Sequence, residues 1–180
     1  MSRKIVPGEP DPFSELELHA WRSLLRLYSA VMRTIDRELQ QAHGLSNTEY
    51  GVLVILVTAP NRSLRLGELA IRNLGSPSGI SRIVDRLAAL GLVERQPDSQ
   101  DGRGAHARLT DAGVRKLREL QVTHHRVARE LFLGRLNERD LRFFVGIAER
   151  ALPGVATDAI WPAGEPSRDA APRVPADSET

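Results

Sequence analysis

The sequence predicts a mainly α fold that carries one small β-hairpin. Along most of the chain, apolar residues recur at steps of three and four, which is the period of an amphipathic helix. Between 91 and 109 the pattern changes, because two short segments of alternating polarity, 91–95 and 105–109, flank a run of turn-forming residues. The chain has 180 residues, of which 41% are hydrophobic, so we expect it to bury one core of its own.

The first predicted helix is long and covers residues 13 to about 41. Its apolar positions fall on one face and are Trp21, Leu24, Leu25, Tyr28, Val31, Met32, Ile35 and Leu39. A second helix is expected to begin at Ser46, because Ser46 and Glu49 have the spacing of a capping box, and to end near Pro60. The apolar run 52–57 within it is too short to span a membrane and is expected to be buried.

Two shorter helices are predicted before the hairpin. The first covers 66–73 and places Leu66, Leu69 and Ala70 on one face. The second covers 76–90, since Ser76 can cap the free amides of a helix start and Pro77 loses no hydrogen bond at the first helical position. Its apolar stripe consists of Ile80, Ile83, Val84, Leu87 and Leu90, and its opposite face of Ser78, Gly79, Ser81, Arg82, Asp85 and Arg86.

The face opposite the stripe has the residue types of a DNA-reading helix. Small side chains let a helix enter a major groove closely, and arginines further along can reach base edges or phosphates. In the hairpin, Asp101 precedes Arg103 by two residues, so its carboxylate can hold the guanidinium extended toward a narrow minor groove. The predicted DNA-binding residues are Ser76, Ser78, Gly79, Ser81, Arg82, Arg86, Asp101 and Arg103. The alternative for Arg82 and Arg86 is a solvated helix face. The alternative for Asp101 and Arg103 is a surface turn whose ion pair adds little stability.

Two more helices are expected after the hairpin. Thr110 can cap the first, whose apolar positions approximate steps of three and four: Val114, Leu117, Leu120 or Gln121, His124, Val127 and Leu131. The last opens at Asn137 and uses Leu141, Phe144, Val145, Ala148 and Leu152. Beyond Pro153 the composition shifts to Pro, Ala, Ser and Asp, so we expect residues 163–180 to be disordered, and we expect 1–12 to be flexible.

Taken in order, these motifs resemble the MarR-type winged helix-turn-helix transcriptional regulators over about residues 15–152. The matching segments are 67–70, 76–87, 91–95, 98–103 and 109–113. The resemblance implies a homodimer that binds a pseudo-palindromic operator in double-stranded DNA, usually represses, and is released by a small ligand or by thiol oxidation. It also implies a domain at 13–162, with the winged helix-turn-helix at about 61–110 and a helical dimerisation region formed by N- and C-terminal helices at about 13–42 and 111–152.

Two positions depart from the pattern of the family that the chain resembles. Such families usually have Leu-Gly-Leu between the two short helices, whereas this chain has Asn73-Leu74-Gly75. Because Asn and Gly both tolerate left-handed backbone, we expect Asn73 or Gly75 to make the turn. At position 79 the family commonly carries a hydroxyl residue, and Gly79 offers no side chain for that contact.

The resemblance also bears on how a regulator of this kind would be switched. The chain has no cysteine, which excludes thiolate chemistry, disulfides and thiolate zinc sites. In the family the effector crevice lies near the first helix, so Trp21, Arg22 and Tyr28 are the candidate ligand-binding residues, suited to an aromatic or anionic ligand such as an aromatic carboxylate or phenol. Packing in the core or between subunits is the alternative role for Trp21 and Tyr28.

Metal and cofactor chemistry receives no support from the sequence. His124 and His125 are adjacent, and neighbours on a helix point about 100° apart, so they do not make a chelating pair. Nor is there a nucleophile with a base at recognisable spacing or a phosphate-binding glycine loop. We therefore predict a protein that is not an enzyme and uses no cofactor.

Charge and composition narrow the remaining classes of protein. The net charge is +2, yet the segment 61–110 has eight arginines against five acids, a local excess suited to phosphate. Only Lys4 and Lys116 are lysines, so arginine is the usual basic residue along the whole chain. The number of arginines in 61–110 is therefore weak evidence for DNA binding. With no membrane span and no apolar export segment in 1–12, we expect a cytoplasmic protein. The alternatives are a winged-helix adaptor that binds proteins and, for the apolar faces, the ordinary core of a monomer.

Overall fold

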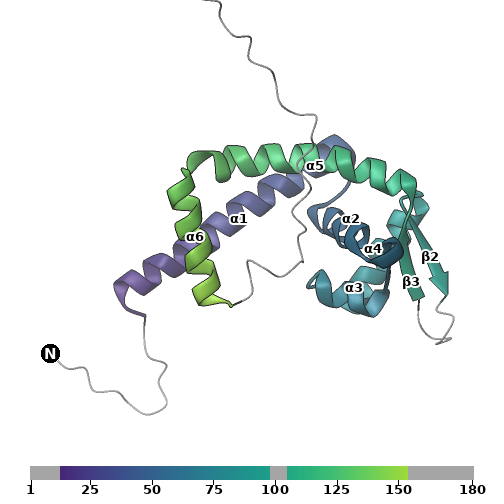
Figure 1. Ribbon diagram of the computed structural model, residues 1–180, viewed down its shortest axis with the longest axis horizontal. Coiled ribbons are helices and arrows are strands. Elements are labelled where there is room, and N and C mark those ends of the chain that lie inside the picture. The colour runs from purple at the N-terminus through teal and green to yellow at the C-terminus, as the bar shows by residue number, and fades with distance from the viewer. Residues whose placement is uncertain (1–12, 98–104, 154–180) are drawn as a thin grey trace, which may run out of the picture.

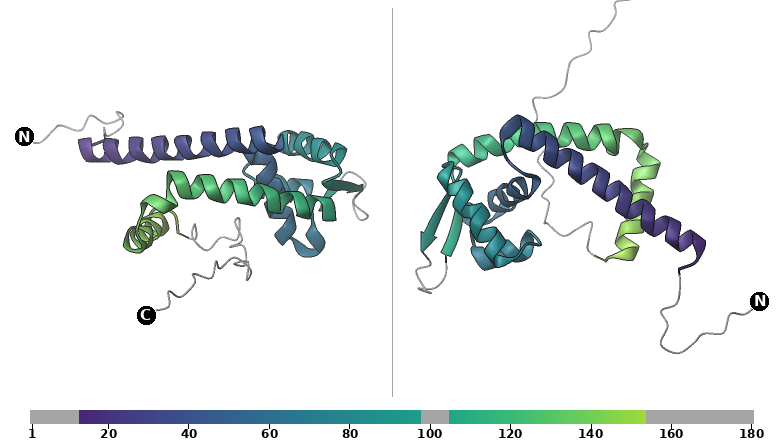
Figure 2. Two further views of the ribbon diagram at one scale, coloured as in Figure 1. Left: turned by 90° about the horizontal axis from the view of Figure 1, so that it is seen from above. Right: turned by 180° about the vertical axis from the view of Figure 1, so that it is seen from behind.

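Two long helices lie side by side and support a smaller lobe at one end of the molecule (Figures 1 and 2). The computed structural model describes residues 13–97 and 105–153. Helices α1 (Glu15–His43) and α5 (Asp111–Leu131) form the long pair, and α6 (Glu138–Ala151) turns away from the end of α5 after the short 3-10 helix η2 (Leu133–Arg135). We call α1, α5 and α6 the arm. The mainly α fold predicted from the sequence is confirmed.

The lobe contains the remaining helices and the only sheet among the described residues. Its elements are α2 (Asn47–Thr58), the 3-10 helix η1 (Pro60–Arg62), β1 (Ser63–Arg65), α3 (Leu66–Arg72), α4 (Pro77–Ala89), β2 (Val93–Pro97) and β3 (Ala105–Leu109). The sheet is antiparallel in the order β1-β3-β2, with Val93 opposite Leu109 and Leu64 opposite Ala107. The two predicted hairpin strands are confirmed. Strand β1 was not predicted, because three residues are too few to show an alternating pattern.

Helix ends follow the predicted capping residues. The Ser46 hydroxyl accepts a hydrogen bond from the Glu49 amide and the Glu49 carboxylate accepts one from the Ser46 amide, which completes the expected capping box of α2. Thr110 caps α5 through its hydroxyl oxygen alone, whereas Asn137 caps α6 and forms a capping box with Asp140. The sequence located these helix starts because a cap depends only on residues within one turn.

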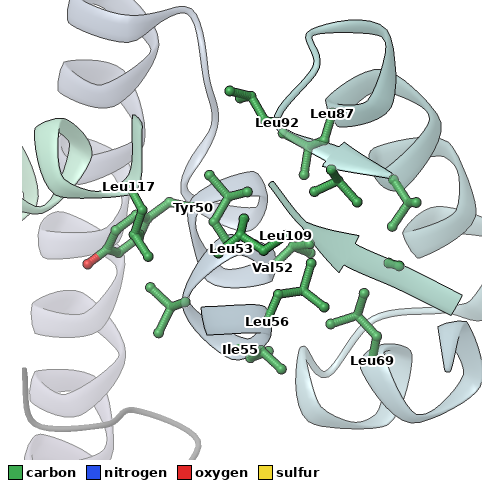
Figure 3. Packing of buried hydrophobic residues seen from close by; sticks show 14 of the residues in the cluster. Tyr50, Val52, Leu53, Ile55, Leu56, Leu69, Leu87, Leu92, Leu109 and Leu117 are labelled. Carbon is green, nitrogen blue, oxygen red and sulfur yellow. The ribbon is translucent and has the colours of Figure 1, made fainter. Parts of the chain in front are cut away.

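Helix α2 forms the centre of the core. Val52, Leu53, Val54, Ile55 and Leu56 are all buried, as predicted for this apolar run. Figure 3 shows the helix between two layers, with Tyr50 beside Leu117 of α5 and Leu53 and Leu56 toward the sheet and α3. A helix that is apolar on every side must be covered on every side, so α2 fixes the lobe to the arm.

The turn between α3 and α4 differs from its prediction. The left-handed residue is Leu74, at φ +51°, and neither Asn73 nor Gly75 takes that conformation. The Gly75 amide donates to the Ala70 carbonyl and the Leu74 amide to the Ile71 carbonyl, which is the hydrogen-bond pattern of a Schellman motif. That pattern places the left-handed residue at position 74, one residue before the glycine.

The apolar stripe of α4 is also shorter than predicted. Ile80, Val84 and Leu87 are buried and Ile83 is partly buried, but Leu90 is 54% exposed. Leu90 lies outside the helix as its C-cap, where the chain already turns toward β2. The buried stripe therefore ends at Leu87, and Leu90, the last position of the predicted stripe, is not part of it.

The arm buries only part of its apolar surface within one chain. Ile35 and Leu39 of α1 are buried, whereas Trp21, Leu24 and Tyr28 on the same face are exposed. Helix α6 contributes no buried residue in the described part of the chain. Residues 1–12 and 163–180, for which flexibility and disorder were predicted, lie outside the described residues. Within 13–97 and 105–153, no helix is both long and apolar enough to cross a bilayer.

Candidate nucleic-acid interface

The first turn of α4 presents polar groups at the surface of the lobe. Ser76 is the N-cap, and its hydroxyl accepts a hydrogen bond from the Gly79 amide at 3.1 Å. Ser78 and Arg82 are exposed one turn apart, with Arg82 Nε donating to the Ser78 carbonyl at 3.4 Å. The Ser78 hydroxyl lies 3.4 Å from that of Ser76, so both serines and Arg82 stand at the exposed start of the helix.

Gly79 keeps this surface flat. A Cβ at Gly79 would stand 2.9 Å from the Ser76 hydroxyl oxygen, closer than real Cβ atoms approach. A side chain here would push against the capping hydroxyl, so the chain gains a bare helix surface and an undisturbed cap. The absence of a side chain at position 79 therefore leaves room for the Ser76 hydroxyl that caps the same helix.

Ser81 faces the hairpin and has a partner there. Arg95 of β2 donates through Nη1 to the Ser81 hydroxyl at 3.3 Å and to Asp85 Oδ1 at 2.5 Å. The two contacts join the middle of α4 to the first strand of the hairpin, so that the helix and the hairpin keep a fixed relative orientation. Arg95 was not among the predicted site residues, because the spacing of residues within one helix does not show which strand residue will pack against it.

Arg86 points toward the junction of α1 and α2. Its Nε lies 3.2 Å from Glu49 Oε1, and its Nη2 donates to the Gly44 carbonyl at 2.8 Å. Glu49 is 2% exposed, so this is a contact between a half-exposed arginine and a buried carboxylate. The structure thus gives Ser81 and Arg86, both predicted to bind DNA, intramolecular partners.

The two strands of the hairpin also carry charged side chains at the surface of the lobe. Asp101 and Arg103, predicted to act in a minor groove, lie outside the described residues, between the paired ends Pro97 and Ala105. Arg108 of β3 lies 3.9 Å from Glu94 across the ladder. The described part of the hairpin therefore presents this half-exposed pair of opposite charges at the surface of the lobe.

The three candidate ligand-binding residues share α1 but do not line a described cavity. Trp21 and Tyr28 are 49% and 63% exposed, and Arg22 is exposed beside them. A polar cleft of about 440 Å³ lies elsewhere, where η1 meets the sheet and the start of α5, and the ion pair Arg62–Asp111 belongs to its lining. That cleft has no residue in common with the candidate set.

His124 of α5 packs against α2, with His125 beside it. Its ring stacks on Tyr50 with centroids 4.8 Å apart, and the His125 ring stands edge-on at 5.8 Å. Burial, with a smaller contribution from His125, lowers the pKa of His124 to about 4. Among the residues that the structure describes, no three His, Cys, Asp or Glu side chains converge as metal ligands would.

A helix-turn-helix made of α3 and α4, backed by a three-stranded sheet with a β2–β3 hairpin, is the winged helix-turn-helix arrangement. The model of the MarR family matches residues 43–104 of the chain. An uncharacterised HTH-type transcriptional regulator of Mycobacterium bovis, Mb0904, is 31% identical over 118 residues, which cover 62% of this chain and 79% of that protein. The chain therefore belongs to the MarR family of transcriptional regulators.

Two further comparisons place the chain among proteins of this family. The transcriptional repressor MprA of Escherichia coli K12 is 28% identical over 124 residues, or 69% of each chain. The crystal structure of Sco3205, a MarR family transcriptional regulator from Streptomyces coelicolor in complex with DNA, is 30% identical. It superposes with a TM-score of 0.74 over 91% of this chain and 97% of that one.

Proposed function

We propose that this protein is a homodimeric, sequence-specific DNA-binding repressor that a small ligand releases from its operator. The observation that carries the proposal is the exposed first turn of α4, where Ser78 and Arg82 stand on a bare helix surface at Gly79. This turn belongs to a scaffold whose relative Sco3205 was crystallised with DNA. A helix start with small residues and one arginine suits close entry into a major groove.

Within this proposal the predicted contacts divide by position. Ser78 and Arg82 read base edges, Ser76 and Gly79 shape the helix start, and Asp101 with Arg103 enters a flanking minor groove. Arg103 supplies positive charge to the narrow groove, and the acid holds it extended. Two copies of α4 would then reach successive major grooves about 10 bp apart.

The dimer is supported by the arm. In one chain Leu24 is 52% exposed and Phe143 is 67% exposed, although both α1 and α6 are strongly amphipathic. Exposed apolar side chains that gather on the two terminal helices need a partner, and a second copy of the same arm offers the same surface. The proposed organisation is a winged helix-turn-helix at about 61–110 and dimerisation helices at about 13–42 and 111–152.

The ligand would bind on α1 of the arm and act on the separation of the two lobes. It can release DNA only by favouring a lobe separation that does not fit the grooves, so its preference for that state limits the response. Trp21, Arg22 and Tyr28 offer aromatic surface and one cation, which suit an aromatic carboxylate. Benzoate is a simple probe, and tryptophan fluorescence of a Trp161→Phe variant would report its binding near Trp21.

The deciding experiment is a binding titration on the promoter region of the protein's own gene at several salt concentrations. We expect a complex that prefers one protected duplex over a scrambled duplex of equal length and weakens steeply with salt. Absence of a sequence-preferring complex would refute the proposal. Capture of a protein partner that depends on the exposed face of α4, without DNA binding, would favour an adaptor instead.

A further inference from the structure

Arg86 joins three elements of the protein through one guanidinium group. It lies in the last turns of α4, and its Nη2 donates at 2.8 Å to the carbonyl of Gly44, the residue that ends α1. Its Nε lies 3.2 Å from Glu49 in the first turn of α2. The end of α1, the start of α2 and the candidate reading helix therefore meet at this side chain.

The acidic partner of Arg86 is already committed to its own helix. Glu49 Oε2 accepts hydrogen bonds from the Ser46 amide at 2.7 Å and the Ser46 hydroxyl at 2.9 Å. The remaining oxygen, Oε1, lies toward Arg86. A carboxylate that is 2% exposed needs compensating charge, and Arg86 is the cation paired with it among the described residues.

The contact with Gly44 adds a second reason for this geometry. The carbonyls at the end of a helix carry partial negative charge, and arginine is favoured there both as a charge and as a hydrogen-bond donor. Lysine would not replace it, because a single ammonium group lacks the fixed fork that reaches a carboxylate and a carbonyl together. The guanidinium thus fits two acceptors that come from different helices.

We infer that Arg86 is a positioning residue, which holds α4 at a fixed angle to the α1–α2 junction through Glu49 and Gly44 and does not itself read DNA. The inference rests on the proposed function, since it concerns the orientation of a helix that meets DNA. Arg86, predicted from the sequence to contact DNA, would instead hold the DNA-reading helix in place. Glu49, a buried acid distant in sequence from α4, would then also be a determinant of DNA specificity.

The test compares Arg86→Ala, Arg86→Lys and Glu49→Gln for binding to the protected promoter duplex and to a scrambled duplex. We expect each variant to lower the ratio of the two affinities by about tenfold, the order expected when one charge-assisted hydrogen bond is lost. The slope of log affinity against log salt should stay as in the wild type, because no phosphate contact is removed. Arg86→Ala in the Glu49→Gln background should cost less than it does alone.

The control is Arg72→Ala, which removes an exposed arginine of α3 that pairs with Glu68 of its own helix. It should leave the affinity ratio unchanged. A variant that merely unfolds in part would weaken both duplexes equally, so the ratio separates positioning from general loss of structure. Should Arg86→Ala unfold the lobe, Arg86→Lys and Glu49→Gln still carry the test.

The opposite result is well defined. If Arg86→Ala lowered the salt slope by about one per subunit, while Glu49→Gln bound DNA as tightly as the wild type or more tightly, Arg86 would be a direct phosphate contact and the inference would be wrong. If the wild-type protein itself preferred no duplex, the proposed function would fail first.

Discussion

Gly113, in the first turn of α5, lies so close to the carbonyl oxygen of Leu92 that no Cβ fits between them. Thr110 holds the same junction from the other side, since its hydroxyl donates to the Gly91 and Leu92 carbonyls at 2.8 and 3.1 Å. The start of α5 is therefore fixed against the end of the α4–β2 turn. Through this contact the arm determines where the hairpin begins.

Replacing Gly113 with alanine should destabilise the protein. The added methyl group would meet backbone, which cannot move aside as a flexible side chain can, so we expect a loss of about 1–3 kcal/mol in the free energy of unfolding. Urea unfolding at a fixed protein concentration measures it. Gly67→Ala is the matched control: it lies in α3 with nothing within 4 Å of its Cβ position, and alanine there should stabilise by up to about 1 kcal/mol. Equal effects at the two sites would contradict the close contact.

Leu74 offers a prediction of the opposite sign. A left-handed backbone at φ +51° costs a leucine about 1–2 kcal/mol, and its side chain is 89% exposed, so packing returns little of that energy. Leu74→Gly should therefore raise the free energy of unfolding by about 1 kcal/mol. Leu90→Gly, at an exposed leucine with φ −86°, should bring no such gain. A loss of stability in Leu74→Gly would mean that this leucine packs against something in solution.

These examples show which parts of the fold were predictable. The caps at Ser46, Ser76 and Thr110 were located because the interacting atoms belong to one helical turn. The turn residue was misplaced, since it depends on which amide reaches back to Ala70, and this is a property of backbone geometry. Contacts between distant segments, such as Arg86 with Glu49, leave no periodic signal in a single sequence.

The candidate site was also predictable only in part. The sequence identified the polar face of α4 from residue types alone. It did not separate Arg82, which contacts only the backbone of its own helix among the described residues, from Arg86, which pairs with a buried acid. Both arginines lie on one face of one helix, and only the folded neighbour distinguishes them.

His124 should make the protein less stable in mild acid. Its pKa in the folded protein is about 4, below the ordinary value of 6.5, because burial disfavours the charged ring. As the pH falls below 6.5 the unfolded chain takes up a proton that the folded chain refuses until about pH 4, so the free energy of unfolding falls by up to about 3 kcal/mol over that range.

Urea titrations of the wild type and of His124→Phe at several pH values test this prediction. Phenylalanine keeps an aromatic ring against Tyr50 and removes the titrating group. The carboxylates and other histidines titrate alike in both proteins, so the difference between the two curves isolates His124. Parallel curves from pH 6.5 to 4 would contradict the prediction.

A charge on the exposed face of α1 should separate the proposed dimer. Leu24→Glu places a carboxylate on the exposed apolar stripe, and burying it against a second copy would lose apolar contact and desolvate a charge in each subunit. We expect dimer dissociation to be at least roughly 100-fold easier, as seen by sedimentation across a concentration series. Ile71→Glu, at an exposed apolar residue of α3 outside the proposed dimerisation helices, should leave the dimer intact. A monomeric wild type would remove the basis of this prediction.

Arg82 and Arg103 should affect DNA binding in different ways. Arg82→Ala removes a contact to a base edge, so we expect a loss of about 1–3 kcal/mol on the preferred duplex and relaxed preference at one position in each half-site. Arg103→Ala removes charge from a minor groove, which should weaken binding to all duplexes similarly and lower the salt slope by about one per subunit. Titrations on duplexes with single base-pair changes, repeated at several salt concentrations, separate the two outcomes. If Arg82→Ala weakened every duplex equally, α4 would bind through phosphates and the base-reading role of Arg82 would be wrong.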